Sequence, residues 1–285
     1  MKIITSVRGM QVYSESARNA GQKISFVPTM GYFHDGHLSL MRKGRQVADC
    51  LVISIYVNPT QFGPMEDFEK YPRDFERDKA LAGDIGVDVI FFPENKEMYP
   101  EHYQTYVNVE SVTQNLCGMS RPGHFRGVTT VCAKLFNIVK PHYAIFGRKD
   151  FQQLVAIRRM VLDLNMGLDI IGMPIVREPD GLAMSSRNVY LKTDEREAAL
   201  SLSRSLKIAK EMYDKGERDV ASILAEVRKY IELYPHTNID YAKICDTTTL
   251  KDVGHIERES VLALAVKINK TRLIDNYIFG NRLDI

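Results

Sequence analysis

Residues 24–37 read ISFVPTMGYFHDGH, and this stretch decides the fold. An apolar run at Ile24–Pro28 leads into Gly31 and then into two histidines three residues apart, His34 and His37. The apolar run is continuous rather than alternating, as is typical of a strand covered on both faces. The stretch therefore predicts a buried strand, a short turn and the start of a helix.

The first two-thirds of the chain repeats this alternation of short apolar runs and longer amphipathic segments. The predicted strands are Ile24–Pro28, Leu51–Val57, Val87–Phe92, His142–Phe146 and Leu168–Gly172. The predicted helices are Leu38–Val47, Arg73–Asp84, Val128–Val139 and Phe151–Asn165. Strands that alternate with helices are joined by right-handed crossovers into a parallel sheet. We therefore predict an α/β fold with a Rossmann-like, doubly wound parallel sheet.

The pattern changes after about Val176. Thr193 or Asp194 can cap a long helix that ends near Gly216, and a second helix runs from about Asp219 to Leu233. Three strand-like segments follow at Ile239–Ile244, Ser260–Ile268 and Thr271–Asn276. We therefore predict two domains: residues 1–176 with the parallel sheet, and residues 177–285 as a smaller C-terminal α+β domain entered through 177–187.

Composition narrows the possible partners. The 285 residues carry 38 basic and 36 acidic side chains, a net charge of +2, which does not indicate a nucleic-acid or anionic-membrane surface. The four cysteines lack metal-ligand spacing and read as reduced thiols. The first residues lack a signal-peptide core, and the longest apolar run, Cys50–Val57, is too short to span a bilayer. We expect a cytoplasmic protein with no nucleic-acid or membrane partner.

The two histidines point to phosphate chemistry. At a helix start, we expect several unpaired backbone N–H groups and the positive end of the helix dipole to face a ligand. The dipole contributes only about 0.3–1 kcal/mol, or ~2 kcal/mol when partly buried, so imidazole donors at His34 and His37 would add to it. Gly36 would let a phosphate approach the backbone. A plain capping turn is the alternative, and metal ligation lacks an evident third ligand nearby.

Two further clusters follow predicted strands, where ligands bind in doubly wound sheets. Asn58 and Gln61 carry amides that can orient a small polar substrate, although Asn-Pro is also a common turn. Gly147 allows close approach and Lys149 can meet phosphate. Asp150 can hold a ribose hydroxyl or cap the next helix.

A last cluster lies where the second domain begins. Ser185, Ser186 and Arg187 offer two hydroxyls and a guanidinium fork, which suit pyrophosphate unless the segment is a solvated loop. The clusters supply cationic and amide groups without a Ser-His-Asp, paired-carboxylate or zinc pattern. That set favours phosphoryl or nucleotidyl transfer, in which catalysis is mostly positioning and charge stabilisation.

The chain resembles the pantothenate synthetase (pantoate–β-alanine ligase) family, a branch of the HIGH-type nucleotidyltransferases. The resemblance runs from about Ile3 to Asn276, and its motifs stand in the family's order. They are PTMGYFHDGH, YVNPTQFGPMEDFEKYPRDFERD, RPGHFRGV, FGRKDFQQL, REPDGLAMSSRN and TRLIDN. Asn269 replaces a frequent glycine before Lys270, and we expect the turn to survive because Asn tolerates positive φ. Tyr32 and Phe33 stand where smaller or aliphatic residues are more usual.

The resemblance implies an enzyme of vitamin B5 and coenzyme A biosynthesis that works in two steps. Pantoate and ATP would give pantoyl adenylate and pyrophosphate, and β-alanine would then release AMP and pantothenate. Mg²⁺ would be bound mainly through the ATP phosphates, not by protein side chains. The family likeness also implies a homodimer and a mobile cover at Gly63–Asp74.

The resemblance also implies roles for single residues. His34, His37 and Lys149 would be catalytic. ATP would contact Met30, His34, His37, Gly147, Lys149, Asp150, Val176, Met184, Ser185, Ser186 and Arg187. Pantoate would contact Gln61, Gln153, Met30 and Asn58.

Two rival functions stay open. One is an adenylyltransferase of the same superfamily that joins AMP to a phosphate, which has no need for paired Gln61 and Gln153. The other is a nucleotide-sensing module without turnover, which the intact His34, His37, Lys149 and Arg187 disfavour.

Overall fold

The computed structural model describes residues 1–64 and 66–280, so the end of the predicted second domain, 281–285, lies outside it. The chain forms two compact units. The first unit comprises residues 1–109, 121–148 and 156–173, and the second comprises 110–120, 149–155 and 174–285. The second unit thus takes over at Pro174, where the sequence predicted a boundary after Val176, and it includes two earlier stretches.

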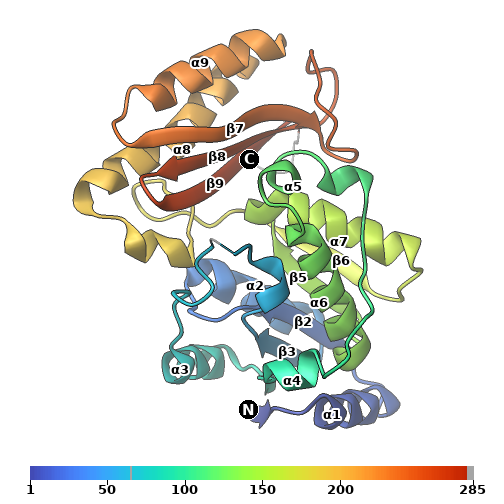
Figure 1. Ribbon diagram of the computed structural model, residues 1–285. Helices are drawn as coiled ribbons and strands as arrows, with labels where there is room; N and C mark the ends of the chain where they lie inside the picture. The colour runs from blue at the N-terminus through green and yellow to red at the C-terminus, as the bar shows by residue number, and fades with distance from the viewer. Residues whose placement is uncertain (65, 281–285) are drawn as a thin grey trace. The chain divides into compact units, whose positions relative to one another are not determined.

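A six-stranded parallel sheet lies at the centre of the first unit (Figure 1). Its strands, in spatial order, are β1 (Lys2–Ile4), β4 (Val89–Phe91), β3 (Cys50–Ile55), β2 (Ile24–Thr29), β5 (Tyr143–Gly147) and β6 (Asp169–Met173). The five predicted strands are all present, with ends within two residues of the prediction. Every residue of β3 is buried, as its continuous apolar sequence indicated. β2 neighbours β3 on one side and β5 on the other, so the chain reverses direction across the sheet at β2.

Helices cover both faces of this sheet. α2 (Asp35–Val47) packs with α3 (Phe75–Ile85), and α1 (Val7–Asn19) packs with α6 (His124–Val139). Val27 of β2, Ile53 of β3 and Met41 of α2 are fully buried in one apolar cluster between the sheet and these helices. The Rossmann-like prediction is confirmed. The remaining helices of this region are α4 (Asn95–Met98) and α7 (Phe151–Asp163), whose first turn belongs to the second unit.

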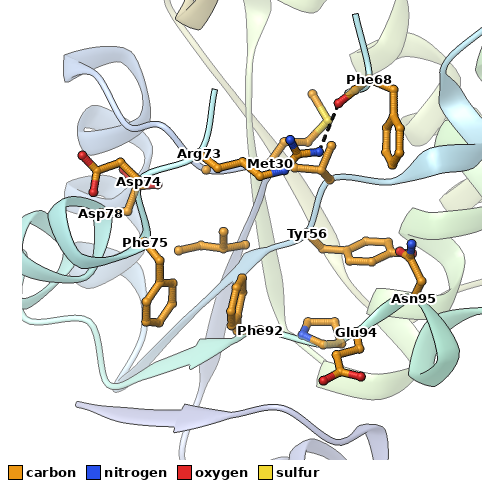
Figure 2. A pocket seen from close by; sticks show the side chains of 14 residues that line it. Met30, Tyr56, Phe68, Arg73, Asp74, Phe75, Asp78, Phe92, Glu94 and Asn95 are labelled. Atoms are coloured by element: carbon orange, nitrogen blue, oxygen red, sulfur yellow. Dashed lines mark hydrogen bonds between the residues drawn. The ribbon is translucent and has the colours of Figure 1, made fainter. Parts of the chain in front are cut away.

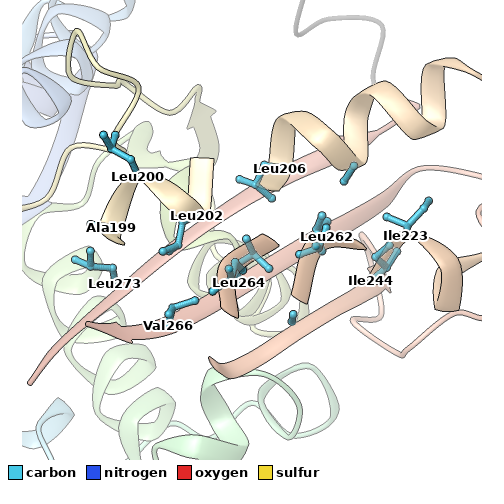
Figure 3. Packing of buried hydrophobic residues seen from close by; sticks show 14 of the residues in the cluster. Ala199, Leu200, Leu202, Leu206, Ile223, Ile244, Leu262, Leu264, Val266 and Leu273 are labelled. Atoms are coloured by element: carbon cyan, nitrogen blue, oxygen red, sulfur yellow. The ribbon is translucent and has the colours of Figure 1, made fainter. Parts of the chain in front are cut away.

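The second unit packs two helices on a small antiparallel sheet. Strands β7 (Thr237–Asp246), β8 (Ser260–Ile268) and β9 (Thr271–Phe279) pair in that order, with α8 (Thr193–Asp214) and α9 (Val220–Glu232) against them. Figure 3 shows the apolar layer between the helices and the sheet, which includes Leu206, Ile223 and Leu262. The short α5 (Cys117–Ser120) also belongs to this unit. The predicted α+β architecture is confirmed.

One predicted cap was wrong, and one predicted turn was right. Thr193 is the first residue of α8 rather than its cap, and the Glu195 carboxylate instead accepts from the Lys192 N–H at 2.9 Å. The cap is displaced because an acidic third residue can itself satisfy a backbone donor that precedes the helix. Asn269, in the β8–β9 turn, has a φ of 51°, as expected of Asn in place of Gly.

Two predictions from the sequence concern membrane-spanning helices and the state of the cysteines. Within the described ranges, we found no helix both long and apolar enough to cross a membrane. The four cysteines are all free and buried. Burial raises the pKa of the Cys132 thiol to about 12, so this sulfur is held as the neutral thiol.

Candidate active site

The turn between β2 and α2 has an unusual backbone. Gly31 has a φ of 86° and Tyr32 a φ of 54°, so two consecutive residues are left-handed. Tyr32 bears a cost of about 1–2 kcal/mol for this conformation, which Gly31 escapes. A Cβ on Gly31 would lie 3.0 Å from Asp78 Oδ2 and 3.1 Å from Ile55 Cγ2. The turn is therefore close-packed as well as strained.

A buried carboxylate holds this turn. Asp78, on α3, is 1% exposed, and its two oxygens accept from the Tyr32 N–H at 2.5 Å and the Phe33 N–H at 2.7 Å. Burial raises the pKa of Asp78, although these two N–H donors oppose the shift. The charged form of Asp78 thus depends on the turn as much as the turn depends on Asp78.

The histidine side chains accept hydrogen bonds from backbone N–H groups at the start of α2. His34 Nδ1 accepts from the Gly36 N–H at 3.1 Å, and His37 Nδ1 accepts from the His34 N–H at 3.4 Å. The N–H groups of His37 and Leu38 both donate to the carbonyl of His34. The expectation of several unpaired N–H groups facing a ligand was therefore wrong, because the imidazoles and the His34 carbonyl satisfy them.

The same bonds fix the tautomer of both rings. Because Nδ1 accepts in each neutral ring, the proton is on Nε2, which is then the donor nitrogen. The two ring centroids are 4.1 Å apart, and His37 also lies 5.6 Å from the ring of buried Phe33. Both side chains are half-buried. The turn therefore presents two adjacent N–H donors of defined tautomer, which is chemistry suited to an oxyanion or a phosphate.

A pocket of about 330 Å³ opens beside Met30 and Asp78 (Figure 2). Its walls are mainly apolar, and Phe75 stacks on Phe92 with ring centroids 4.5 Å apart. At the rim, Arg73 Nη2 donates to the carbonyl of Phe68 at 3.1 Å. The pocket thus lies at the carboxyl ends of β2 and β3, where the sequence predicted a ligand site.

The predicted pantoate residues of the first unit lie together. Asn58 is 1% exposed, and its Nδ2 donates to Gln61 Oε1 at 3.1 Å and to the carbonyl of Gly127 at 3.2 Å. Gln61 Nε2 in turn donates to the Met30 sulfur at 3.3 Å. The three side chains form one chain of hydrogen bonds at the 3₁₀ turn η1 (Pro59–Gln61).

The motif RPGHFRGV, for which sequence reasoning gave no role, supports this turn. A Cβ on Gly127 would lie 2.3 Å from the carbonyl oxygen of Thr60, so only glycine lets α6 approach η1. His124 Nδ1 donates to the carbonyl of Gln61 at 2.8 Å, which leaves Nε2 to accept from Arg121 Nη1 at 3.0 Å. Arg121 also donates to both oxygens of Glu66 at 2.6 Å.

Glu66 ties the predicted cover, residues 63–74, to this network. Burial raises the pKa of Glu66, but the Arg121 guanidinium outweighs that effect and holds the pKa below its usual range. Phe62 meets Phe68 and Tyr71 with ring centroids 5.4 Å and 6.0 Å away. Met65 of the predicted cover lies outside the described residues. The segment is thus anchored at both an ion pair and an aromatic cluster.

The motif FGRKDFQQL divides between the two units. Gly147 ends β5 in the first unit, whereas Lys149, Asp150 and Gln153 belong to the second. Lys149 Nζ lies 4.0 Å from Asp150 Oδ2, and its side chain is 20% exposed. Gln152 donates to the carbonyls of residues 112 and 115 and accepts from the N–H of residue 117. Gln152 is therefore structural, and its neighbour Gln153 is the residue that the resemblance predicts to bind pantoate.

The remaining predicted ATP residues lie on one segment of the second unit. The Met184 N–H donates to the carbonyl of Val176 at 3.0 Å, and the Arg187 N–H donates to Ser185 Oγ at 3.3 Å. Ser186, between them, is buried. The structure thus places Met184 beside Val176, next to an isolated antiparallel bridge between Arg177 and Ala183, and puts Ser186 and Arg187 in the first turn of the 3₁₀ helix η4 (Ser186–Tyr190).

Residues of the motif TRLIDN hold this segment in place by hydrogen bonds. Asp275, 3% exposed, accepts from Arg177 Nη1 at 2.7 Å and Nη2 at 2.9 Å, a bidentate pair. Asn276 Nδ2 donates to the carbonyl of Lys149 at 3.0 Å. Asp275 and Asn276 therefore position the two segments of the second unit that carry Lys149 and Arg187.

Sequence reasoning missed these supporting residues. Asp78 left one signal, because it shares a helix face with the partly buried Phe75 and with buried Ala82, where a charge is unexpected. Arg121 and Asp275 left no local signal, since their partners Glu66 and Arg177 lie far away in the sequence. Among residues 1–64 and 66–280, no three His, Cys, Asp or Glu side chains lie close enough together to hold a metal ion.

Comparison with known proteins identifies relatives along the whole chain. The family model for pantoate-beta-alanine ligase matches residues 2–278. A pantothenate synthetase from Syntrophus aciditrophicus is 69% identical over 285 residues, covering 100% of both chains. One from Geobacter sulfurreducens is 61% identical over 280 residues, covering 98% of this chain and 99% of the relative.

Solved structures show the same relationship. The crystal structure of pantothenate synthetase from Thermus thermophilus matches with a TM-score of 0.92 at 42% identity, covering 97% of this chain and 99% of that one. A pantoate-beta-alanine ligase from Francisella tularensis, complexed with beta-gamma ATP and beta-alanine, matches with a TM-score of 0.80 at 32% identity. That match covers 98% of this chain and 97% of the other.

Proposed function

The chain belongs to the pantoate–β-alanine ligase family and is therefore a ligase, and we propose that it forms pantothenate from pantoate, β-alanine and ATP through a pantoyl adenylate. The observation that carries the proposal is the family match over residues 2–278. The Francisella relative, complexed with beta-gamma ATP and beta-alanine, supports two of the three substrates.

The first proposed step is adenylation. A carboxylate oxygen of pantoate attacks the α-phosphorus of ATP, and the bond from that phosphorus to the oxygen bridging the β-phosphate breaks, releasing pyrophosphate. The Nε2–H donors of His34 and His37 stabilise the negative charge that grows on the phosphate oxygens. Lys149, with Ser185, Ser186 and Arg187, clamps the phosphates.

The other predicted residues orient the reactants. Gly147 and Asp150 hold the ribose, and Val176 and Met184 contact the nucleotide. Pantoate is held by Gln61, Gln153, Met30 and Asn58. Support comes from the hydrogen-bond chain Asn58–Gln61–Met30, since it fixes the amide of Gln61 as an oriented donor and acceptor.

The second proposed step is acyl transfer. The amine of β-alanine attacks the carbonyl carbon of the adenylate, the bond from that carbon to the AMP oxygen breaks, and the amine loses a proton. The segment 63–74 covers the adenylate, and excluding water there prevents its hydrolysis. The Glu66–Arg121 pair supports this role, because it offers the segment a defined anchored position.

We also propose the metal, the assembly and the compartment. A Mg²⁺ ion would be held mainly by ATP phosphate oxygens, as is usual for this ion, and would neutralise phosphate charge there. A homodimer rests on the family likeness alone. A reducing, cytoplasmic compartment is supported by four free buried thiols.

Two assays test the proposal. AMP and pyrophosphate should form in equal amounts when pantoate, β-alanine and Mg-ATP are all present. Without β-alanine, the enzyme should exchange labelled pyrophosphate into ATP only when pantoate is added. Exchange supported by a phosphomonoester instead would favour the rival adenylyltransferase, and ATP binding without AMP formation would favour the nucleotide sensor.

A further inference from the structure

Asp78 is the most deeply buried charged group near the two histidines, and the proposed mechanism gives it no role. It lies on α3 and lines the pocket beside Met30 (Figure 2). Its nearest charged neighbour is the guanidinium of Arg77, with Nη1 3.8 Å from Oδ1. Each of its oxygens is instead used by a backbone N–H of the turn.

The carboxylate satisfies two donors that a buried turn could not otherwise pair. Tyr32 and Phe33 direct their N–H groups toward the same side chain, which consecutive left-handed residues at Gly31 and Tyr32 make possible. Only a planar group with two acceptor oxygens satisfies both N–H groups at once. An amide in its place would offer one acceptor and set a donor against the second N–H.

Asp78 acts on the histidines through Phe33. Phe33 is 1% exposed, its N–H is bound to Asp78, and its ring lies against His37. The next N–H along the chain, that of His34, donates to His37 Nδ1 and so sets the tautomer of His37. A shift of Phe33 therefore moves both the packing and the hydrogen bond that orient this ring.

We propose that Asp78 is a positioning residue for adenylation, because it holds Tyr32 and Phe33 in the one backbone conformation that presents Nε2–H of His34 and His37 to the phosphates. The inference rests on the proposed function. Asp78 touches neither substrate nor reacting atoms, and it acts only through the turn.

The test compares Asp78→Asn with a matched variant, Asp246→Asn. Asp246 is also a buried carboxylate that accepts two backbone N–H groups of a turn, those of Thr248 and Thr249, both at Oδ1. Its Oδ2 pairs with Arg258 Nε at 3.1 Å, and the turn lies in the second unit, so Asp246→Asn removes a buried turn carboxylate that does not touch the histidine turn. Asp78→Asn should lower the maximal rate of pantoate-dependent pyrophosphate exchange by about 100-fold, as expected for a small misplacement of reacting groups. Asp246→Asn should change it less than about twofold, while both variants lose melting temperature.

A spectroscopic readout separates positioning from simple destabilisation. Nitrogen NMR of labelled histidine should show the Nε2–H tautomer for His34 and His37 in the wild type and in Asp246→Asn. In Asp78→Asn the two rings should shift toward a mixture of tautomers. Unchanged rings together with an unchanged exchange rate would overturn the inference.

A second variant approaches the same contact from the other side, should Asp78→Asn not fold. Gly31→Ala leaves Asp78 intact but places a methyl group 3.0 Å from its Oδ2 at a φ of 86°, so the turn must move. A folded Gly31→Ala enzyme with the wild-type exchange rate would also overturn the inference. Failure of the wild type to exchange pyrophosphate with pantoate would instead overturn the proposed function, which makes the two failures distinguishable.

Discussion

His34 and His37 differ in what holds them, although they read alike in the sequence. His34 Nδ1 accepts from a donor within its own turn, that of Gly36, whereas His37 accepts at 3.4 Å and relies also on its contact with Phe33. The hydrogen bond at His37 Nδ1 is thus the longer of the two. Substitutions at His37 can therefore separate the donor from the structural role.

His37→Asn is expected to remove the donor and keep the turn. The Asn oxygen can reach the position of Nδ1 and accept from the His34 N–H, but nothing replaces Nε2. Losing one preorganised donor to an oxyanion lowers a rate by about 10²–10³-fold. We expect a loss of that size in pantoate-dependent pyrophosphate exchange, with the melting temperature and the KM for pantoate close to wild type.

Gln61→Ala is the matched control for His37→Asn. It should raise the KM for pantoate more than it lowers the maximal exchange rate. If both variants lost stability to the same extent and showed the same kinetic defect, the histidine would be structural rather than a donor.

At this scale the sequence was sufficient to identify the residue types but not their hydrogen bonds. The spacing of His34 and His37 at a helix start was visible, yet the rings satisfy the very N–H groups that we expected to bind a ligand. Which donor an imidazole takes depends on side-chain torsions that residue spacing does not specify.

The start of α8 and the β8–β9 turn are joined by one carboxylate. Glu195 accepts from the Lys192 N–H at 2.9 Å and from Asn269 Nδ2 at 2.6 Å. The hydrogen bond from the Lys192 N–H lowers the pKa of Glu195 the most, and the one from Asn269 lowers it further, so this pKa lies below its usual value. Asn269 therefore serves the turn through its positive φ and the helix through its amide.

This lowered pKa predicts a pH-dependent stability. An unfolded Glu titrates near pKa ~4.3, so a group with a lower folded pKa stabilises the protein above that pH and loses its effect as pH falls through the folded value. The melting temperature of the wild type should exceed that of Glu195→Gln at pH 7. The difference should shrink between roughly pH 5 and pH 3.

Glu211→Gln, on an exposed site of the same helix, is the control for Glu195→Gln. Its melting temperature should follow the wild type across the same pH range. A constant difference between wild type and Glu195→Gln from pH 7 to pH 3 would contradict the linkage.

Element boundaries were predictable where burial was strong. β8 was predicted at its exact residues, and the central strands within two, because long apolar runs leave little choice of register. β1 and α1 were not predicted. β1 has only three residues, the first two exposed, and α1 buries just Met10, Ser14 and Ala17, so few residues of either element belong to the core.

The division of the whole molecule into two units was only partly predictable. The sequence predicted a boundary after Val176, and the last stretch of the second unit begins at Pro174. Residues 110–120 and 149–155 belong to that unit because of long-range bonds, such as those that Gln152 makes to residues 112, 115 and 117. No local sequence pattern predicts such long-range hydrogen bonds.

Hydrogen exchange with ATP tests the proposed function at the scale of the whole molecule. The proposed ATP ligands lie on both units, with His34 and His37 on the first and Lys149 and Arg187 on the second. Binding free energy stabilises whatever unit contacts the ligand, by ~2.7 kcal/mol at 100 times Kd. Mg-ATP without pantoate should therefore slow the slowest amides of both β2 and β8 by about 100-fold. Because each strand lies in the core of its own unit, slowing of β2 alone would remove Lys149 and Arg187 from the ATP ligands, and slowing of β8 alone would remove the histidines.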